Sequence, residues 1–341
     1  MSNQPLISII INNYNYALFL PAAIDSALGQ AYSNFEVLVV DDGSTDHSRD
    51  IINSYGSRVE PIFKSNGGQS SAFNVGFENA KGEIIIFLDS DDLLYPNCLE
   101  QVAQSFRNNP DIVCTRWYLD NIDQNEISLD STNPAKGLNI PVGDLSAEIL
   151  QNGWRFVTPP TSGNAFLRSC LNEFFPIPKN LIRCADIFLF ANSAVRGELA
   201  FIDKRLGAYR HNLLSSTHHL LNRKKVYSEI LAADLTDRSL VSFYQGHPGY
   251  GQANRNRWTY VGDELLRKIL IRFSGKNNLS SELYQPISFT KFFQTHSVKK
   301  NIKYLVGAIF FSLAWSEEIA FWGAGVLLNK HNLVGKKKIS I

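Results

Sequence analysis

Three aspartates stand within four residues at the end of an apolar stretch: Asp89, Asp91 and Asp92 follow the run 84–88. Carboxylates this close together repel one another, and a divalent cation is the simplest partner that relieves the repulsion. A hard cation held by few protein oxygens usually keeps a phosphate as a further ligand, so the pattern favours a metal site that binds a phosphate-bearing substrate. The alternative is a solvated acidic turn in which one carboxylate caps the helix after Pro96.

An apolar strand pattern followed by polar residues occurs four times before residue 95, at 6–11, 35–40, 59–63 and 84–88. Helical patterns separate these runs, and that alternation predicts an α/β fold with a mostly parallel sheet covered by helices. Ligands of such sheets bind outside the carboxyl ends of the strands. We therefore expect the polar segments 12–15, 41–42, 66–69 and 89–92 to converge on one nucleotide site.

Composition is that of a packed globular protein, with 44% hydrophobic and 19% charged residues in a chain of 341. Its four cysteines are widely spaced, which indicates reduced thiols rather than disulfides or a zinc site. The first strand pattern begins at Leu6 and leaves no room for a signal peptide, so we expect a cytoplasmic protein. A change of composition at Asn222 predicts a catalytic domain over 1–221 and a helical C-terminal region over 222–341.

Charge is distributed unevenly along the chain. Residues 1–150 carry 7 Lys and Arg against 20 Asp and Glu, whereas residues 151–341 carry 26 against 12. The acidic part suits a metal site, and the basic part suits an anionic partner such as a membrane surface or a phosphate-bearing acceptor. Residues 304–328 are strongly apolar with lysines on both sides, which fits a soluble helical pair or helices lying on the inner face of the cytoplasmic membrane. A membrane span is the third alternative, and Glu317 and Glu318 near the middle of the stretch argue against it. No nucleic-acid partner is predicted.

Several nucleotide-binding classes lack their motifs in this sequence. No Gly-x-Gly-x-x-Gly follows the first strand pattern, which argues against a dinucleotide dehydrogenase, and no P-loop motif occurs. A haloacid-type phosphatase needs a hydroxyl residue two positions after its second aspartate, and Leu93 stands there.

Four segments together resemble glycosyltransferase family 2, the inverting nucleotide-diphospho-sugar transferases of the GT-A fold. They are 6–15, 39–46, 66–76 and 87–96, and the resemblance covers about residues 5–215. It implies that Asn13, Tyr14 and Asn15 line the pocket of the base and that Asp41 or Asp42 hydrogen-bonds uracil. Further contacts to the nucleotide-sugar are expected from Gly68, Gln69, Asn74, Asp89 and Ser90.

The resemblance also assigns the metal and the base. Asp89 and Asp91 match the family's Asp-x-Asp motif, with Asp91 as the expected direct ligand of Mg²⁺ or Mn²⁺. Inverting transfer needs one base, and Asp186 matches the family's catalytic aspartate; the alternative is that Asp186 only caps the helix that follows it. One departure is Phe73, which stands where the family often has an arginine.

These features predict an inverting glycosyltransferase. Its donor would be a UDP-sugar and its acceptor a hydroxyl of a glycan or a lipid-linked glycan in surface polysaccharide synthesis. A sugar-phosphate nucleotidyltransferase is the alternative among enzymes, although the loop 66–71 lacks the basic residues that it would need. The alternative outside enzymes is a catalytically inactive carbohydrate-binding protein, against which the intact carboxylates argue.

Overall fold

The structure is a computed structural model that describes residues 4–154, 156–182, 184–211 and short runs between 232 and 245. The chain divides into two compact units, Met1–Tyr250 and Gly251–Ile341, and all described residues lie in the first. The predicted domain boundary near 221 and the apolar stretch 304–328 lie outside the described residues. Among the helices that are described, none is both long enough and apolar enough to cross a membrane.

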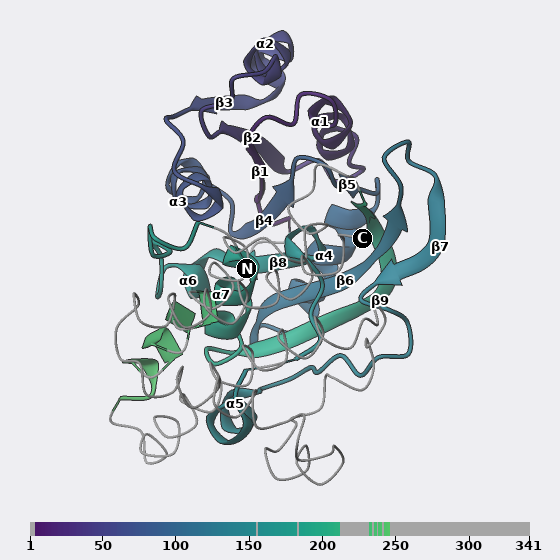
Figure 1. The fold of residues 1–341 in the computed structure, drawn as a ribbon. Helices are drawn as coiled ribbons and strands as arrows, with labels where there is room; N and C mark the ends of the chain where they lie inside the picture. The colour runs from purple at the N-terminus through teal and green to yellow at the C-terminus, as the bar shows by residue number, and fades with distance from the viewer. Residues whose placement is uncertain are drawn as a thin grey trace, which may run out of the picture. The chain divides into compact units, whose positions relative to one another are not determined.

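Four parallel strands form the N-terminal part of the sheet, in the order β3-β2-β1-β4. In chain order the elements are β1 (Ile7–Asn13), α1 (Leu20–Leu28), β2 (Phe35–Asp41), α2 (Ser48–Ser54), β3 (Glu60–Phe63), α3 (Gln69–Asn79) and β4 (Ile84–Asp89). Figure 1 shows these strands side by side between their helices. Each strand lies where an apolar run predicts it, and the α/β fold with a helix-covered, largely parallel sheet is confirmed.

The remaining strands continue the sheet beyond β4 in the order β8-β6-β9-β5, and β7 pairs with β6. The elements are β5 (Leu93–Leu94), α4 (Cys98–Asn108), β6 (Ile112–Ile122), β7 (Ser128–Asn133), α5 (Ser146–Asn152), η2 (Thr161–Gly163), β8 (Asn164–Leu167), α6 (Arg168–Leu171), α7 (Ala185–Ser193) and β9 (Glu198–Arg210). Strand β8 runs antiparallel to both β4 and β6, whereas β9 runs parallel to β6.

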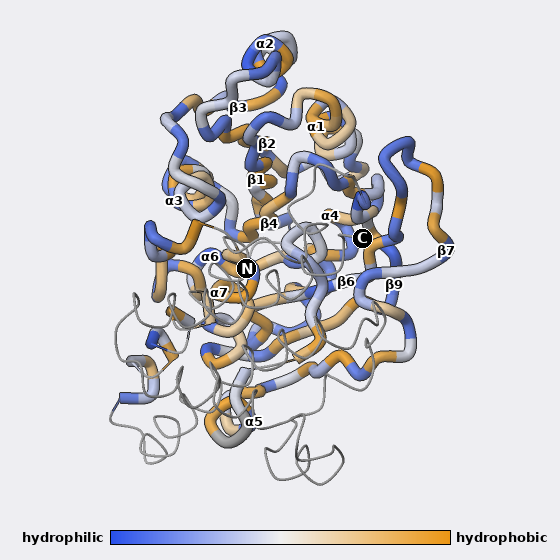
Figure 2. The backbone as a smooth tube through the Cα atoms, viewed as in Figure 1, coloured by the Kyte–Doolittle hydropathy of each residue, from blue (hydrophilic) through white to orange (hydrophobic). Residues whose placement is uncertain are grey.

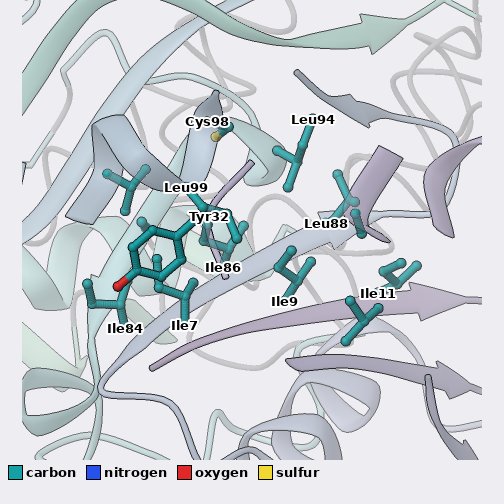
Figure 3. Packing of buried hydrophobic residues seen from close by; sticks show 14 of the residues in the cluster. Ile7, Ile9, Ile11, Tyr32, Ile84, Ile86, Leu88, Leu94, Cys98 and Leu99 are labelled. Carbon is teal, nitrogen blue, oxygen red and sulfur yellow. The ribbon is translucent and has the colours of Figure 1, made fainter. Parts of the chain in front are cut away.

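The two faces of the sheet bury different side chains. Ile7, Ile9 and Ile11 of β1 point to the face on which α1 and α4 pack, and the close-up in Figure 3 shows them in one cluster with Ile86 of β4 and Leu99 of α4. Full burial of a side chain of this size stabilises the fold by roughly 1.5–3 kcal/mol. Figure 2 accordingly shows hydrophobic colour along β1 and β4 and mixed colour on the helices.

Helix α3 packs on the opposite face of the sheet. The ring of Phe73 stacks on that of Phe87 in β4, with 4.3 Å between centroids. Gly76 faces Ile10 so closely that a Cβ there would lie 2.4 Å from an Ile10 methyl group. Glycine is therefore required at this position for α3 to reach the sheet.

In the second half of the domain, strands continue through polar segments. The polar segment 120–144 begins inside β6, and a hairpin then leads into β7. The apolar stretches 199–202 and 206–209 belong to one strand, β9, whose middle residues 203–205 are exposed. Exposed polar residues break the hydrophobic pattern from which strands are predicted, although the backbone pairing continues.

Candidate active site

The carboxyl ends of β1, β2 and β4 meet at one edge of the sheet, as predicted. Asn12 is paired in register with Asp89, and its Nδ2 donates to Asp89 Oδ1 at 3.1 Å. Asn13 is paired with Asp41, and its Nδ2 donates to Asp41 Oδ1 at 3.1 Å. Neighbouring asparagines, whose side chains alternate along the strand, thus hold the last carboxylates of the two flanking strands.

Asp41 is completely buried, and both of its oxygens have protein partners. Besides Asn13, it accepts hydrogen bonds from the Ser44 backbone N–H at 3.1 Å and from Arg49 Nε at 3.0 Å. This network fixes the turn that leads from β2 into α2.

Asp42 holds the glycine loop that precedes α3. Its carboxylate accepts hydrogen bonds from Lys64 Nζ and from the backbone N–H groups of Gly67 and Gly68, the last at 2.7 Å. Gly68 has φ +83°, and a Cβ there would lie 2.6 Å from the Ile182 side chain. The loop therefore requires glycine at this position, and Gly68 and Asp42 are brought together as the sequence predicts.

The end of β1 continues as a turn that is fastened to the start of α2. Asn15 adopts φ +57°, and its Oδ1 accepts a hydrogen bond from the Thr45 backbone N–H at 2.7 Å. Tyr14 between these anchored residues is 46% exposed. Of the three residues predicted to line the base pocket, Tyr14 therefore offers the most open surface to a planar ligand.

Asn74 lies farther along α3, and both ends of its side-chain amide form hydrogen bonds with the backbone of Ile177. Asn74 Nδ2 donates to Ile177 O at 2.8 Å, and Asn74 Oδ1 accepts from Ile177 N at 2.7 Å. Its predicted contact to the donor remains a prediction, while its observed contact joins two segments of the protein. Phe73 is fully buried on the sheet and supplies nothing in place of the family's arginine.

The turn after β4 presents the three aspartates in different surroundings. Asp89 accepts hydrogen bonds from Asn12 and from Gln69 Nε2, the latter at 3.3 Å, and its backbone N–H donates to Ser162 Oγ. Burial raises the pKa of Asp89, and the hydrogen bonds from Asn12, Gln69 and Thr161 oppose that rise. Asp91 is partly exposed, whereas Ser90 between the two is buried.

Asp92 is the structural member of the trio. It is 1% exposed, accepts a hydrogen bond from Ser162 Oγ at 2.6 Å and another from the Arg210 backbone N–H at 2.9 Å. Burial first, and the charges of Asp91 and Asp89 next, raise its pKa well above the usual range. Asp92 thereby joins β9 and η2 to the turn that carries the other two aspartates.

Asp186 is the second residue of α7, and Cys184, with φ +61°, occupies the N-cap position without a capping hydrogen bond from its side chain. Burial raises the pKa of Asp186 to about 6, and the nearby negative charge of Asp89 adds to the rise. Backbone N–H groups in the first turn of the helix partly oppose it. A carboxyl group with this pKa is ionised at neutral pH and is still basic enough to accept a proton.

Sequence reasoning missed three residues that surround the aspartates. The pKa of the Tyr16 phenol is raised, by burial first and then by the charges of Asp91 and Asp89, so this residue lies beside them. Thr161 and Ser162 of η2 hydrogen-bond the turn through Asp89. The Pro-Pro-Thr-Ser-Gly sequence that ends at 163 indicates a tight turn, but no local pattern tells which strand end it meets.

The donor atoms at this edge of the sheet suit a hard cation. Asp89 and Asp91 offer carboxylate oxygens, the ligands that Mg²⁺ and Mn²⁺ prefer. Among the described residues, no group of three or more His, Cys, Asp or Glu side chains is arranged to hold a metal. The carboxylates of Asp89 and Asp91 fit a cation bound through one or two carboxylates together with substrate phosphates, which is the usual arrangement for Mg²⁺.

Comparisons with known proteins agree with this geometry. The family model described as glycosyl transferase family 2 matches residues 8–175. An uncharacterised glycosyltransferase of Nostoc is 40% identical over 209 residues, which are 60% of this chain and 64% of that protein, so the chain spans less than two thirds of its length. An uncharacterised glycosyltransferase of Haemophilus influenzae is 39% identical over 188 residues, which are 50% of this chain and 74% of that protein.

A solved structure shares the fold at low sequence identity. The crystal structure of S. aureus TarS residues 1–349 in complex with UDP has a TM-score of 0.52 and 15% identity, covering 98% of this chain and 94% of that chain. The family match, the two relatives and the aspartates gathered at the strand ends lead to the same conclusion: the chain belongs to glycosyltransferase family 2.

Proposed function

We propose that the protein is an inverting glycosyltransferase that moves a sugar from a UDP-sugar to a hydroxyl group of a glycan or lipid-linked acceptor in surface polysaccharide synthesis. The observation that carries this proposal is that Asp186 and Asp89, which are far apart in sequence, lie close together: Gln69 hydrogen-bonds both Asp89 and the backbone N–H of Ala185, the residue before Asp186. The Asp186 carboxyl group at the start of α7 has a pKa of about 6, and the negative charge of Asp89 at the end of β4 contributes to that rise.

In the proposed reaction Asp186 accepts the proton of the acceptor hydroxyl while the hydroxyl oxygen forms a bond to the anomeric carbon. The bond from that carbon to the diphosphate oxygen breaks, and its electron pair leaves with UDP. A single displacement of this kind inverts the anomeric configuration. UDP is favoured as the leaving group because TarS, which shares the fold, was crystallised with UDP.

A screen of UDP-sugars tests the proposal. The protein is incubated with each donor and either Mg²⁺ or Mn²⁺, and released UDP and pyrophosphate are measured separately. UDP release from at least one donor is expected. Pyrophosphate release without UDP would identify a nucleotidyltransferase, and the absence of both products with every donor would contradict the proposal.

Asp89 and Asp91 would hold the cation, which when bound would neutralise charge on the diphosphate of the donor. We expect Asp91→Ala to lose metal-dependent UDP binding in titration calorimetry, whereas Asp50→Ala, which changes an exposed carboxylate of α2, keeps it. If the unchanged protein binds UDP with the same affinity with and without EDTA, the metal assignment is contradicted.

The proposed location is the cytoplasm, with peripheral contact to anionic membrane. The excess of Lys and Arg in residues 151–341 supports this contact, at about 1 kcal/mol for each basic residue near the surface. Co-sedimentation with anionic and neutral liposomes tests it. Full-length protein should bind the anionic ones at low salt, and failure to do so would contradict the proposal.

A further inference from the structure

Gln69 joins two parts of the proposed active site that are far apart in sequence. Its Nε2 donates to Asp89 Oδ1 at 3.3 Å, and its Oε1 accepts a hydrogen bond from the Ala185 backbone N–H at 3.3 Å. Ala185 is the first residue of α7 and directly precedes Asp186. One side chain therefore contacts both the last residue of β4 and the start of the helix that carries the proposed base.

The chemistry of the two partners explains why a carboxamide stands here. The Asp89 carboxylate accepts hydrogen bonds, and the Ala185 N–H donates one, so the bridging group must donate on one side and accept on the other. Glutamate at position 69 would lack the donor, and lysine would lack the acceptor. The two contacts also fix which end of the Gln69 amide faces which partner.

Further contacts from α3 hold the segment that leads into α7. The Gln69 N–H donates to Ile182 O at 3.0 Å, and Gly68 next to it packs against Ile182. Farther along α3, Asn74 binds both polar backbone groups of Ile177. The chain that leads into α7 is thus fastened along the side of α3 before it reaches Asp186.

We propose that Gln69 is a positioning residue, which fixes the first residue of α7 relative to Asp89 and thereby sets the place of the Asp186 carboxylate. This inference rests on the proposed function for the role of Asp186. It departs from the expectation that the side chain of Gln69 binds the donor, because that side chain is engaged at both ends by the protein. The glycine loop would then support the base as well as border the nucleotide.

The two contacts of Gln69 differ in how easily they are replaced. Asp89 also receives hydrogen bonds from Asn12 and Thr161, so its position does not depend on Gln69 alone. Ala185 N–H has Gln69 as its acceptor in the described part of the chain. Removing the carboxamide should therefore disturb the start of α7 more than the metal carboxylate.

Two variants of nearly the same shape separate these contacts. Gln69→Met removes both hydrogen bonds, whereas Gln69→Glu keeps an acceptor for Ala185 N–H and loses the donor to Asp89. Asn79→Ala serves as the matched control, because it removes an exposed amide from the other end of α3. Amide hydrogen exchange of Ala185, measured by mass spectrometry on the unliganded full chain, reports the contact without any need for activity.

We expect Gln69→Met to speed Ala185 exchange by about tenfold or more, with the control close to the unchanged protein. Gln69→Glu should fall between the two, because its carboxylate accepts a hydrogen bond from Ala185 N–H but repels Asp89. In the transfer assay, Gln69→Met should lower kcat by about 10–100-fold while the Kd for UDP changes less than about threefold, as displacement of a reacting group by about 1 Å does. Unchanged Ala185 exchange in Gln69→Met would overturn the proposal, as would a rise of the UDP Kd that accounts for the whole loss of activity. If the exchange result holds but no donor is turned over by the unchanged protein, the proposed function fails while the contact stands.

Discussion

Asp186 and Asp89 are chemically identical side chains whose surroundings suit them to different tasks. Asp89 receives hydrogen bonds from Asn12 and Gln69, which hold its carboxylate in one orientation at the end of a strand. Asp186 lies in the first turn of a helix, where burial raises its pKa to about 6. The first arrangement suits a fixed ligand, and the second suits a group that gains and loses a proton.

Replacing Asp186 by Asn tests the role of this residue through both rate and stability. We expect transfer to fall by about 10²–10⁴-fold, the usual contribution of a general base, with donor binding nearly unchanged. In the absence of metal, the variant should be more stable than the unchanged protein at pH 7, by about 1–3 kcal/mol, because an ionised buried carboxylate is removed.

Urea unfolding in EDTA at several pH values measures the stability change. Because the pKa of Asp186 is raised in the folded state from 3.8 to about 6, the unchanged protein loses stability as the pH rises through that window. The difference in the free energy of unfolding between Asp186→Asn and the unchanged protein should therefore be small near pH 4 and reach its full size above pH 6. A variant that is less stable by about 1 kcal/mol and retains its rate would mean that Asp186 only stabilises the helix terminus.

The rate of the unchanged protein should follow the ionisation of the same group. The pKa of about 6 belongs to the protein without metal, and a cation on Asp89 would offset part of the charge that raises it. At saturating metal, kcat/KM should therefore rise about tenfold per pH unit below a pKa of 6 or less and level off above it. A pH profile of kcat/KM at saturating metal measures this acidic limb. The Asp186→Asn variant has a much lower rate, and its profile should lack the limb. A profile that stays flat from pH 4 to 7 would exclude Asp186 as the base.

Residue types and their positions in the sequence predicted the site aspartates, but they did not predict which residues the side-chain amides contact. Asp89, Asp91 and Asp186 stand at predicted ends of a strand or a helix, where polar residues are conspicuous. Asn74 binds Ile177, which lies 103 residues away in sequence, and no pattern near Asn74 shows that this segment passes beside it. Such contacts depend on how distant segments meet in the folded chain.

At the scale of the elements, prediction succeeded where burial is continuous. Strands β1 and β4 are buried on both faces, so their apolar runs are unbroken and easy to recognise. Strand β7 is mostly exposed, and within the described residues it pairs with β6 alone. Its sequence of Ser, Leu, Asp, Ser, Thr and Asn shows no apolar face. Its place depends on the backbone pairing of the hairpin, which hydrophobic patterns do not report.

Asn74→Ala tests whether α3 holds the segment that leads into α7. Ile177 is fully buried, so loss of the amide leaves its N–H and C=O groups without their partner. Each buried unsatisfied group costs about 1–3 kcal/mol, and we expect the free energy of unfolding to fall by about 2 kcal/mol or more.

Denaturant unfolding and UDP titration together check this prediction. UDP affinity should be unchanged, and Asn79→Ala on the exposed end of the same helix should stay within about 0.5 kcal/mol of the unchanged protein. Weaker UDP binding by Asn74→Ala with full stability would instead support the direct contact to the donor that the sequence predicts.

At the scale of the whole molecule, the two kinds of charge separate along the chain. The acidic part contains the strand ends at which the donor and cation would bind, and the basic part contains α7 with Asp186 and the segment beyond it. A site built from both parts can bind a cation–diphosphate pair and still attract an anionic acceptor or surface. Domain organisation beyond residue 221 remains a prediction from composition.

The most direct test of the account is the product of the full-length enzyme. The protein is supplied with Mg²⁺ or Mn²⁺, an acceptor and a UDP-sugar of α configuration, and the new linkage is assigned from its anomeric proton coupling by NMR while released nucleotide is quantified. A β linkage formed with one UDP per transfer, and lost in Asp186→Asn, is the predicted result. An α linkage, or pyrophosphate in place of UDP, would contradict a single displacement with Asp186 as the base.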